Sequence, residues 1–158
     1  MNTVRGVVYV HSAPVPLCPH IEWAIGAVIG RRSFTWDRQP ALRNTVRTEL
    51  SFSGAPGFAA QLASRLVAMQ QLRFEVTQEP SPGTEGFRYA YTPELGLFTA
   101  QIGVHGDILV SEERLRNIVS ESGSDSSLAD SINNLLGSKW DDELDVFRQA
   151  TEDVPVRW

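Results

Sequence analysis

The chain contains one cysteine, one lysine and no long apolar run, and these scarcities exclude several classes of protein. Cys18 on its own forms no internal disulfide, which argues against a secreted, disulfide-stabilised domain. No apolar run approaches the ~20 residues that a membrane helix needs. The first ten residues, MNTVRGVVYV, contain neither the apolar region nor the small-residue cleavage site of a signal peptide. We therefore expect a protein of the reducing cytoplasm that has no membrane partner.

Charge is unevenly distributed along the chain. The 158 residues are 42% hydrophobic and 21% charged, which is ordinary for a globular protein with one core. Residues 1–79 carry eight Arg and five acids, a net charge of +3, whereas residues 80–158 carry a net charge of −8. The total of −5 argues against general nucleic-acid binding, because the neutralisation of phosphates requires clustered positive charge.

The first half of the chain alternates strand-like and helix-like segments. RGVVYVHS (5–12) is typical of a buried strand, and the three prolines of APVPLCP (13–19) predict an irregular segment after it. A helix is expected between Pro19 and Gly30, with one apolar face. That face comprises Ile21, Ala24, Ile25, Val28 and Ile29. The remaining elements are strands over 33–37 and 44–53, a helix over 57–70 and a strand over 72–78. The order β-α-β-β-α-β predicts the split pattern of a ferredoxin-like layer, an antiparallel sheet with two helices on one face.

The second half of the chain adds strands and then helices. FRYAYT (87–92), LGLFTAQIGV (95–104) and DILVS (107–111) predict a three-stranded meander. Three amphipathic helices are expected at 111–121, 127–137 and 139–151. The sequence thus predicts an α+β fold in a single domain, 1–158. Its parts are a ferredoxin-like core (1–78), a β-meander (79–111) and a helical C-terminal extension (112–158).

Several phrases of the sequence stand out in combination. They are GVVYVHSAP followed by LCPHIEWA, LRFEVTQEPSPGTEGFRYAYTPELGLF, a Gly-Asp pair before a strand, and WDDELDVFR followed by PVRW. Together they resemble the actinobacterial domain-of-unknown-function family 3145. The resemblance spans almost the whole chain and agrees with the thirteen Arg against one Lys, a bias typical of a GC-rich genome. It implies a cytoplasmic single-domain protein and supplies no activity, cofactor, partner or catalytic residue.

His11, Cys18 and His20 lie within ten residues of one another. Cys18 stands at the start of an expected helix, where unpaired backbone N–H groups and a neighbouring imidazole would favour a thiolate. Three interpretations are open. The set is a nucleophilic or redox-sensing centre; it binds a metal, although the spacing is not a recurring one and a fourth ligand is missing; or Cys18 is a small buried residue and the histidines hydrogen-bond the proline-rich loop. We favour the last interpretation and predict neither a metal nor a cofactor.

A basic stretch, RRSFTWDRQPALRNTVR (31–47), holds five Arg against Asp37 alone. Arg binds phosphates and carboxylates bidentately and aromatic rings stack on bases, so an anionic ligand, a protein surface or single-stranded RNA would suit this stretch. RNA is disfavoured because TELSFSG lacks the glycine-aromatic signature of ferredoxin-like RNA-binding strands. The alternative is ordinary exposed Arg on strands. The candidate binding residues are Arg31, Arg32, Trp36, Arg38, Arg43 and Arg47.

No segment carries a complete catalytic motif. WDDELD (140–145) is rich in carboxylates, but on a helix these acids spread over the polar side, and we interpret them as a solvated face. The sequence has no phosphate-binding Gly-Lys-Ser loop and no G-x-S-x-G. The leading hypothesis is therefore a non-enzymatic protein-interaction or regulatory module with a protein partner or a second copy of itself. The alternative is a small thiol-dependent enzyme, or a redox or metal sensor, that uses Cys18 with His11 and His20.

Overall fold

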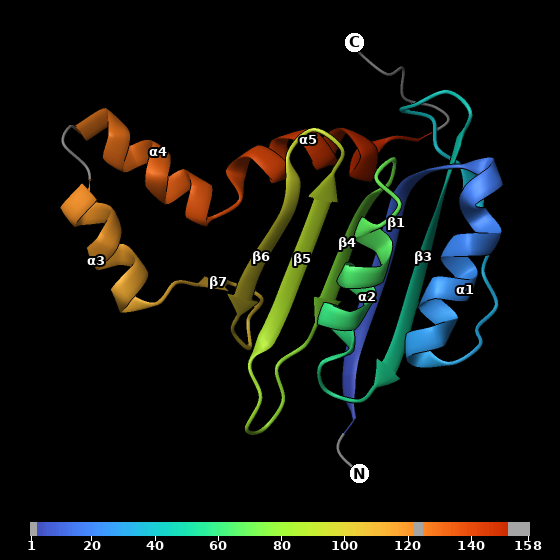
Figure 1. Ribbon diagram of the computed structural model, residues 1–158, viewed down its shortest axis with the longest axis horizontal. Coiled ribbons are helices and arrows are strands. Elements are labelled where there is room, and N and C mark those ends of the chain that lie inside the picture. The colour runs from blue at the N-terminus through green and yellow to red at the C-terminus, as the bar shows by residue number, and fades with distance from the viewer. Residues whose placement is uncertain (1–2, 122–124, 152–158) are drawn as a thin grey trace.

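The computed structural model describes residues 3–121 and 125–151 and is built around one antiparallel sheet (Figure 1). The strands are β1 (Val4–Pro14), β2 (Asp37–Arg38), β3 (Thr45–Gly54), β4 (Arg73–Gln78), β5 (Gly86–Thr92), β6 (Gly96–Ile102) and β7 (Ile108–Leu109). Their order across the sheet is β2-β3-β1-β4-β5-β6-β7, and each neighbouring pair is antiparallel. The predicted meander therefore extends the first sheet beyond β4 rather than folding over it.

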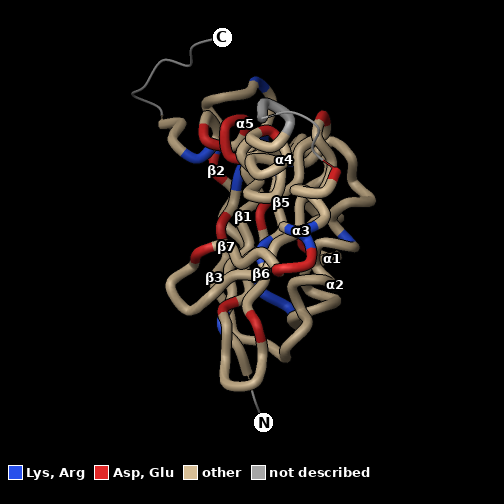
Figure 2. The backbone as a smooth tube through the Cα atoms, turned by 90° about the vertical axis from the view of Figure 1, so that its left-hand side faces the viewer, with Lys and Arg blue, Asp and Glu red and all other residues tan. Residues whose placement is uncertain are grey.

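Helices lie on both faces of this sheet. They are a 3-10 turn (Val15–Leu17), α1 (Cys18–Ile29), α2 (Phe58–Val67), α3 (Glu112–Glu121), α4 (Asp125–Leu135) and α5 (Ser138–Gln149). Helices α1 and α2 cover one face together (Figures 1 and 2). Helix α5 packs on the other face, because adjacent strand residues point to opposite faces. Tyr91 of β5 belongs to the core beneath α1 and α2, whereas its neighbour Ala90 packs with Leu144 of α5. The mixed helix and sheet content confirms the predicted α+β class.

The larger core lies between the sheet and helices α1 and α2. Val8 and Val10, two residues apart on β1, both point into it and are fully buried. Across from them, the predicted apolar face of α1 is confirmed. Ile21, Ala24 and Ile25 are buried, and Val28 and Ile29 pack at the edge of the cluster. The helical spacing i, i+3, i+4 explains why these side chains share one face.

A smaller core lies beneath α5. Leu144 is buried against Ala90, Phe98 and Ala100 of β5 and β6. The indole N–H of Trp140 donates to the carbonyl of Gly96 at 2.9 Å, which ties the start of α5 to the β5–β6 turn. Gly137 joins α4 to α5 with a φ of 71°, a conformation that favours glycine, and a Cβ there would lie 2.7 Å from the Phe98 ring.

Helices α3 and α4 project beyond the β7 edge of the sheet (Figure 1). Helix α3 has no buried residue in the described part of the chain, although Leu115 and Val119 lie on its apolar side. The three C-terminal helices begin and end within two residues of the predicted bounds. No helix within the described ranges is long and apolar enough to cross a lipid bilayer.

The strand predicted at 33–37 is present as β2, but it is shorter and begins later than predicted. Only Asp37 and Arg38 pair with β3. Before them, the hydroxyl of Thr48 donates to the Thr35 carbonyl at 2.8 Å, so a side-chain contact takes the place of a backbone ladder. Phe34 and Trp36 instead pack against the larger core as partly buried side chains.

The prediction of an irregular segment at 13–19 was wrong. Strand β1 continues to Pro14, which pairs with Thr45 at the end of the ladder, where a missing N–H does little harm. Val15–Leu17 form one 3-10 turn and Pro19 lies in the first turn of α1. Each proline thus occupies a position that tolerates its fixed φ.

The packing of α1 predicts an order of stability losses. Ile25→Ala removes a fully buried side chain and leaves a cavity, so we expect a loss of about 2–5 kcal/mol. Cys18→Ser places a hydroxyl at a half-buried helix start and should cost ~1–2 kcal/mol. Urea unfolding of both variants measures the two losses. A larger loss for Cys18→Ser would contradict this account and point to a structural role for the thiol.

Candidate functional site

The carboxylate of Glu75 is buried beneath α5. Alternation along β4 sends Phe74 and Val76 into the larger core and Glu75 to the opposite face, where 6% of the residue is exposed. Three elements supply its partners. His11 Nε2 lies 2.7 Å from one carboxylate oxygen, Arg148 Nε donates to that same oxygen at 3.0 Å, and Arg88 Nη2 donates to the other oxygen at 3.1 Å.

A second carboxylate completes this network. Arg148 Nη2 also donates to Glu75, which makes that ion pair bidentate, and both guanidinium groups reach Asp141 Oδ1, at 3.0 Å from Arg88 and 3.1 Å from Arg148. Two carboxylates thus meet two guanidinium groups. Burial opposes ionisation of Glu75, but the hydrogen bonds and charges of His11 and Arg148 outweigh it and hold the pKa of Glu75 well below its ordinary value.

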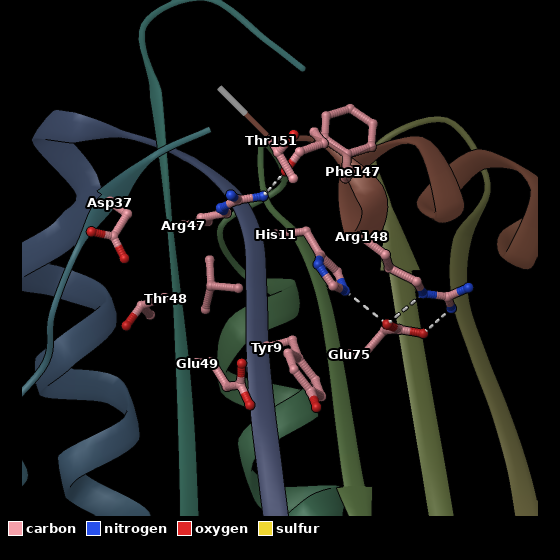
Figure 3. A pocket seen from close by; sticks show the side chains of 12 residues that line it. Tyr9, His11, Asp37, Arg47, Thr48, Glu49, Glu75, Phe147, Arg148 and Thr151 are labelled. Atoms are coloured by element: carbon pink, nitrogen blue, oxygen red, sulfur yellow. Dashed lines mark hydrogen bonds and ion pairs between the residues drawn. The ribbon is translucent and has the colours of Figure 1, made fainter. Parts of the chain in front are cut away.

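The ionised state of Glu75 requires a proton on Nε2 of His11. A carboxylate only accepts hydrogen bonds, so the Nε2 of His11 must carry the proton that it shares with Glu75. The imidazole also stacks on the Tyr9 ring, with the ring centroids 5.6 Å apart. His11 is therefore held rigidly by Glu75 on one side and Tyr9 on the other (Figure 3).

Beside this network lies a pocket of about 580 Å³. Its wall is formed by strands β1 and β3 and by the last turn of α5 (Figure 3). The lining side chains that carry polar or aromatic groups include Tyr9, His11, Asp37, Arg47, Glu49 and Phe147. The volume falls in the range of small-ligand sites, and a few convergent polar groups are typical of them.

Two side chains fix the end of α5 over the pocket. Arg47 Nη1 donates to the carbonyl of Ala150 at 2.7 Å, which satisfies a carbonyl that the helix end leaves unpaired. The fully buried Gln39 donates from Nε2 to the carbonyl of His11 at 2.6 Å and to that of Phe147 at 3.4 Å. The last turn of α5 is thus tied to β1 and β3 independently of Glu75.

A carboxyl pair lies at the other side of α5. Glu143 is hydrogen-bonded to Glu94 of the β5–β6 turn, and Arg73 approaches both, at 4.0 Å from Glu143 and 3.5 Å from Glu94. Burial and the neighbouring Glu94 raise the pKa of Glu143 to about 7, so the pair shares one proton near neutral pH. Among the acids of α5, which the sequence predicted to form a solvated face, Asp142 and Asp145 are exposed, whereas Asp141 and Glu143 hold the helix to the sheet.

A second candidate surface lies on the outer side of α1. Trp23 is 72% exposed there, on the side of the helix that faces away from the core. Beside it is a hollow of about 550 Å³ that Trp23, Glu22, Arg31 and Arg32 line together with small residues of α1. The chain leaves α1 at Gly30, whose φ of 84° ends the helix and returns the two arginines to its flank.

The structure separates the predicted Cys-His set. His11 faces Glu75 on the α5 side of the sheet, whereas Cys18 begins α1 on the opposite side and His20 is exposed in its first turn. Burial, with a smaller effect of Glu22, raises the pKa of the Cys18 thiol, which is opposite to what a nucleophile needs. Within the described ranges, no group of three His, Cys, Asp or Glu is placed to hold a metal ion. Joint catalysis by these three residues stays a prediction that this geometry does not favour.

The structure also divides the basic stretch. Arg31 and Arg32 join Trp23 on α1, and Arg47 lines the pocket beneath α5. Trp36 packs against the larger core, with its indole nitrogen buried and without a hydrogen-bond partner among the described residues. The others, Arg38 and Arg43, are exposed.

Sequence reasoning missed Glu75, Arg88, Arg148 and Trp23. Glu75 lies in RFEVTQ, where a polar residue at an alternate position reads as a solvent-facing one. The sequence does contain an indication of Trp23, because this residue lies outside the apolar face of the amphipathic helix. A large aromatic side chain at such a position has no core to enter.

Comparison with known proteins identifies one matching family. A family model described as "Protein of unknown function (DUF3145)" matches residues 7–158. No curated protein matches the chain. No solved structure matches it either. The match agrees with the resemblance read from the sequence phrases.

Replacement of Glu75 tests its role as the anchor of α5. Glu75→Gln keeps the shape but leaves Arg148 and Arg88 without their buried counter-charge, so we expect a loss of about 3–5 kcal/mol at neutral pH. Because the folded pKa of Glu75 lies below its ordinary 4.5, its contribution is complete above that pH and is lost as the pH falls. Urea unfolding from pH 7 to pH 3 measures both effects. The exposed Glu85→Gln is the control, and an equal loss in both variants would refute this role.

Replacement of Glu143 tests the carboxyl pair. The folded pKa of Glu143, about 7, lies above its ordinary 4.5, so its contribution is complete at acid pH and is lost as the pH rises through about 7. Gln mimics the protonated side chain. We therefore expect Glu143→Gln to match the wild type near pH 4.5 and to be more stable at pH 8, in contrast to the neighbouring, exposed Asp142→Asn. Denaturant unfolding at the two pH values decides, and parallel curves at both would exclude a shared proton.

Proposed function

The chain belongs to the DUF3145 family, and because the description of that family states no function, we propose one from the geometry: a non-enzymatic interaction module. Its binding surface is the outer side of α1, formed by Trp23, Arg31 and Arg32. The partner is a protein segment that carries carboxylates beside an apolar side chain. The single observation that carries this proposal is the 72% exposure of Trp23 next to two arginines.

The exposure of Trp23 is unusual for its residue type. Large aromatic side chains are mostly buried on average, and an indole left in water costs free energy that a partner would recover. Trp and Arg are also the residues most enriched among those that dominate binding energy in protein interfaces. The hollow beside the indole gives an apolar side chain of the partner a place to enter.

The charge of this surface indicates an acidic partner. No carboxylate of the described residues lies within ion-pair distance of Arg31 or Arg32. Of these two side chains, only that of Arg32 donates a hydrogen bond within the described part of the chain, from Nη1 to the carbonyl of Arg31 at 3.3 Å. Both guanidinium groups thus retain most of their donors for carboxylates, which they bind bidentately. Glu22 lines the same hollow, and its negative charge would disfavour any anion beyond the carboxylates that Arg31 and Arg32 bind.

Two further inferences, about the fold and the location of the protein, belong to this proposal. We infer that strands β1 to β4 with α1 and α2 form a ferredoxin-like unit; the order β2-β3-β1-β4, antiparallel throughout, and the placement of both helices on one face support it. We also infer a cytoplasmic location, in keeping with the single cysteine. A regulatory role would follow from the identity of the partner.

Comparative capture from native cell lysate tests the surface. We expect immobilised wild-type protein to retain an acidic protein that elutes with salt, because the contact depends on arginine charge. Trp23→Ala and the double variant Arg31→Ala/Arg32→Ala should each retain at least tenfold less. Arg65→Ala, an exposed arginine on α2, is the matched control and should retain the same amount. A synthetic peptide of the acidic segment of the captured protein should then bind with the same dependence on Trp23.

Two results would overturn this proposal. One is equal retention of the same partner by all four proteins. The other is a wild type that retains nothing and sediments as a monomer. Dimerisation that Trp23→Ala abolishes would replace the acidic partner by a second copy of the chain.

A further inference from the structure

We propose that the pocket beneath α5 is a binding site for a small zwitterion, a molecule with an ammonium and a carboxylate group such as a free amino acid. This site lies on the opposite face of the sheet from Trp23 and does not depend on the proposed partner surface. It rests on the charges that the pocket leaves unpaired.

Opposite charges meet at the pocket without pairing with one another. Arg47, Asp37 and Glu49 all line it (Figure 3). Among the described residues, no carboxylate lies within ion-pair distance of Arg47, and no cation lies within that distance of Asp37 or Glu49. Arg47 is drawn away from the acids because its Nη1 donates to the Ala150 carbonyl. Its other donors are available to a ligand.

The neighbouring charge network does not compete for the ligand. Glu75 receives hydrogen bonds from His11, Arg88 and Arg148, so its two oxygens are fully occupied. Asp141 balances the remaining positive charge. The network therefore serves as a rigid wall, and the ligand meets Arg47, Glu49 and Asp37 as its charged contacts.

The spacing of these groups suits both ends of a zwitterion. Arg47 and Glu49 are two residues apart on β3, so they share one face at a Cα separation of roughly 7 Å. Asp37 is the register partner of Arg47 on β2. A ligand carboxylate beside Arg47 and a ligand ammonium beside Glu49 or Asp37 would pair Arg47 and one of the two acids. A ligand with only a negative charge would meet two carboxylates, and one with only a positive charge would meet Arg47.

The pocket also offers room and apolar surface for a ligand side chain. Its volume of about 580 Å³ exceeds what the charged groups of an amino acid fill. The rings of Tyr9 and Phe147 are part of the lining.

Thermal unfolding of the full chain with each of the twenty common L-amino acids at millimolar concentration is the first test. We expect at least one amino acid to raise the unfolding temperature, because a ligand that binds only the folded state stabilises it. Calorimetric titration with that amino acid then gives its affinity. The amine that lacks its carboxylate and the acid that lacks its ammonium should each bind at least tenfold more weakly.

Two variants connect this binding to the named residues. Glu49→Gln keeps the shape of the side chain and removes its charge, and Arg47→Gln removes the cation; each should weaken binding at least tenfold. Arg65→Gln and Glu85→Gln, exposed on the surface elsewhere, should leave binding unchanged. The proposal is overturned if no amino acid shifts the unfolding temperature, if the amine or the acid alone binds as tightly, or if Glu49→Gln binds like the wild type.

Discussion

The burial of one carboxylate, that of Glu75, decides how helix α5 lies on the sheet. A charge removed from water is tolerated only when its oxygens are fully hydrogen-bonded, and here the donors come from β1, β5 and α5. The apolar contacts of α5 are few, chiefly Leu144 and Phe147, and would allow the helix to slide or rotate. The bidentate pair between Arg148 and Glu75 fixes its register, together with the hydrogen bonds that Arg47 and Gln39 donate to its end. The pocket exists because α5 is held at that distance from β3.

Local patterns in the sequence were sufficient to predict the helices and strands, but they did not predict the charged contacts between them. Alternation in β3 and helical spacing in α1 and α2 follow from which side chains must avoid water, so they are visible in short windows of sequence. Two of the three partners of Glu75, His11 and Arg148, lie 64 and 73 residues away along the chain, so no short window of sequence contains either of them together with Glu75. Asp141 and Asp145 likewise look equivalent in sequence, yet Asp141 alone of the two reaches both Arg88 and Arg148.

The basic stretch illustrates a second limit. Its arginines are close in sequence, but α1 ends before Arg31 whereas Arg47 lies within β3, on the sheet face away from α1. Segments that join a helix layer to a sheet must cross between layers, and neighbours in sequence are thereby sent to different surfaces. The basic stretch 31–47, which the sequence suggested was one binding surface, therefore contributes residues to two separate surfaces. The same crossing placed Trp36 against the core rather than beside the arginines.

The two proposed surfaces differ from the anchor of α5 in what they contribute to the fold. Trp23, Arg31 and Glu49 bury little apolar area and, among the described residues, pair with no buried charge, so the described fold gives no reason for those residue types at those positions. Glu75 and His11, in contrast, are explained by the packing of α5 even though their charge network has the appearance of a catalytic centre. Perturbed ionisation marks structural networks as well as active sites. In the described part of this chain, charged side chains that line a cavity without an ion-pair partner therefore indicate a binding site more strongly than Glu75 does, although the pKa of Glu75 is the most perturbed.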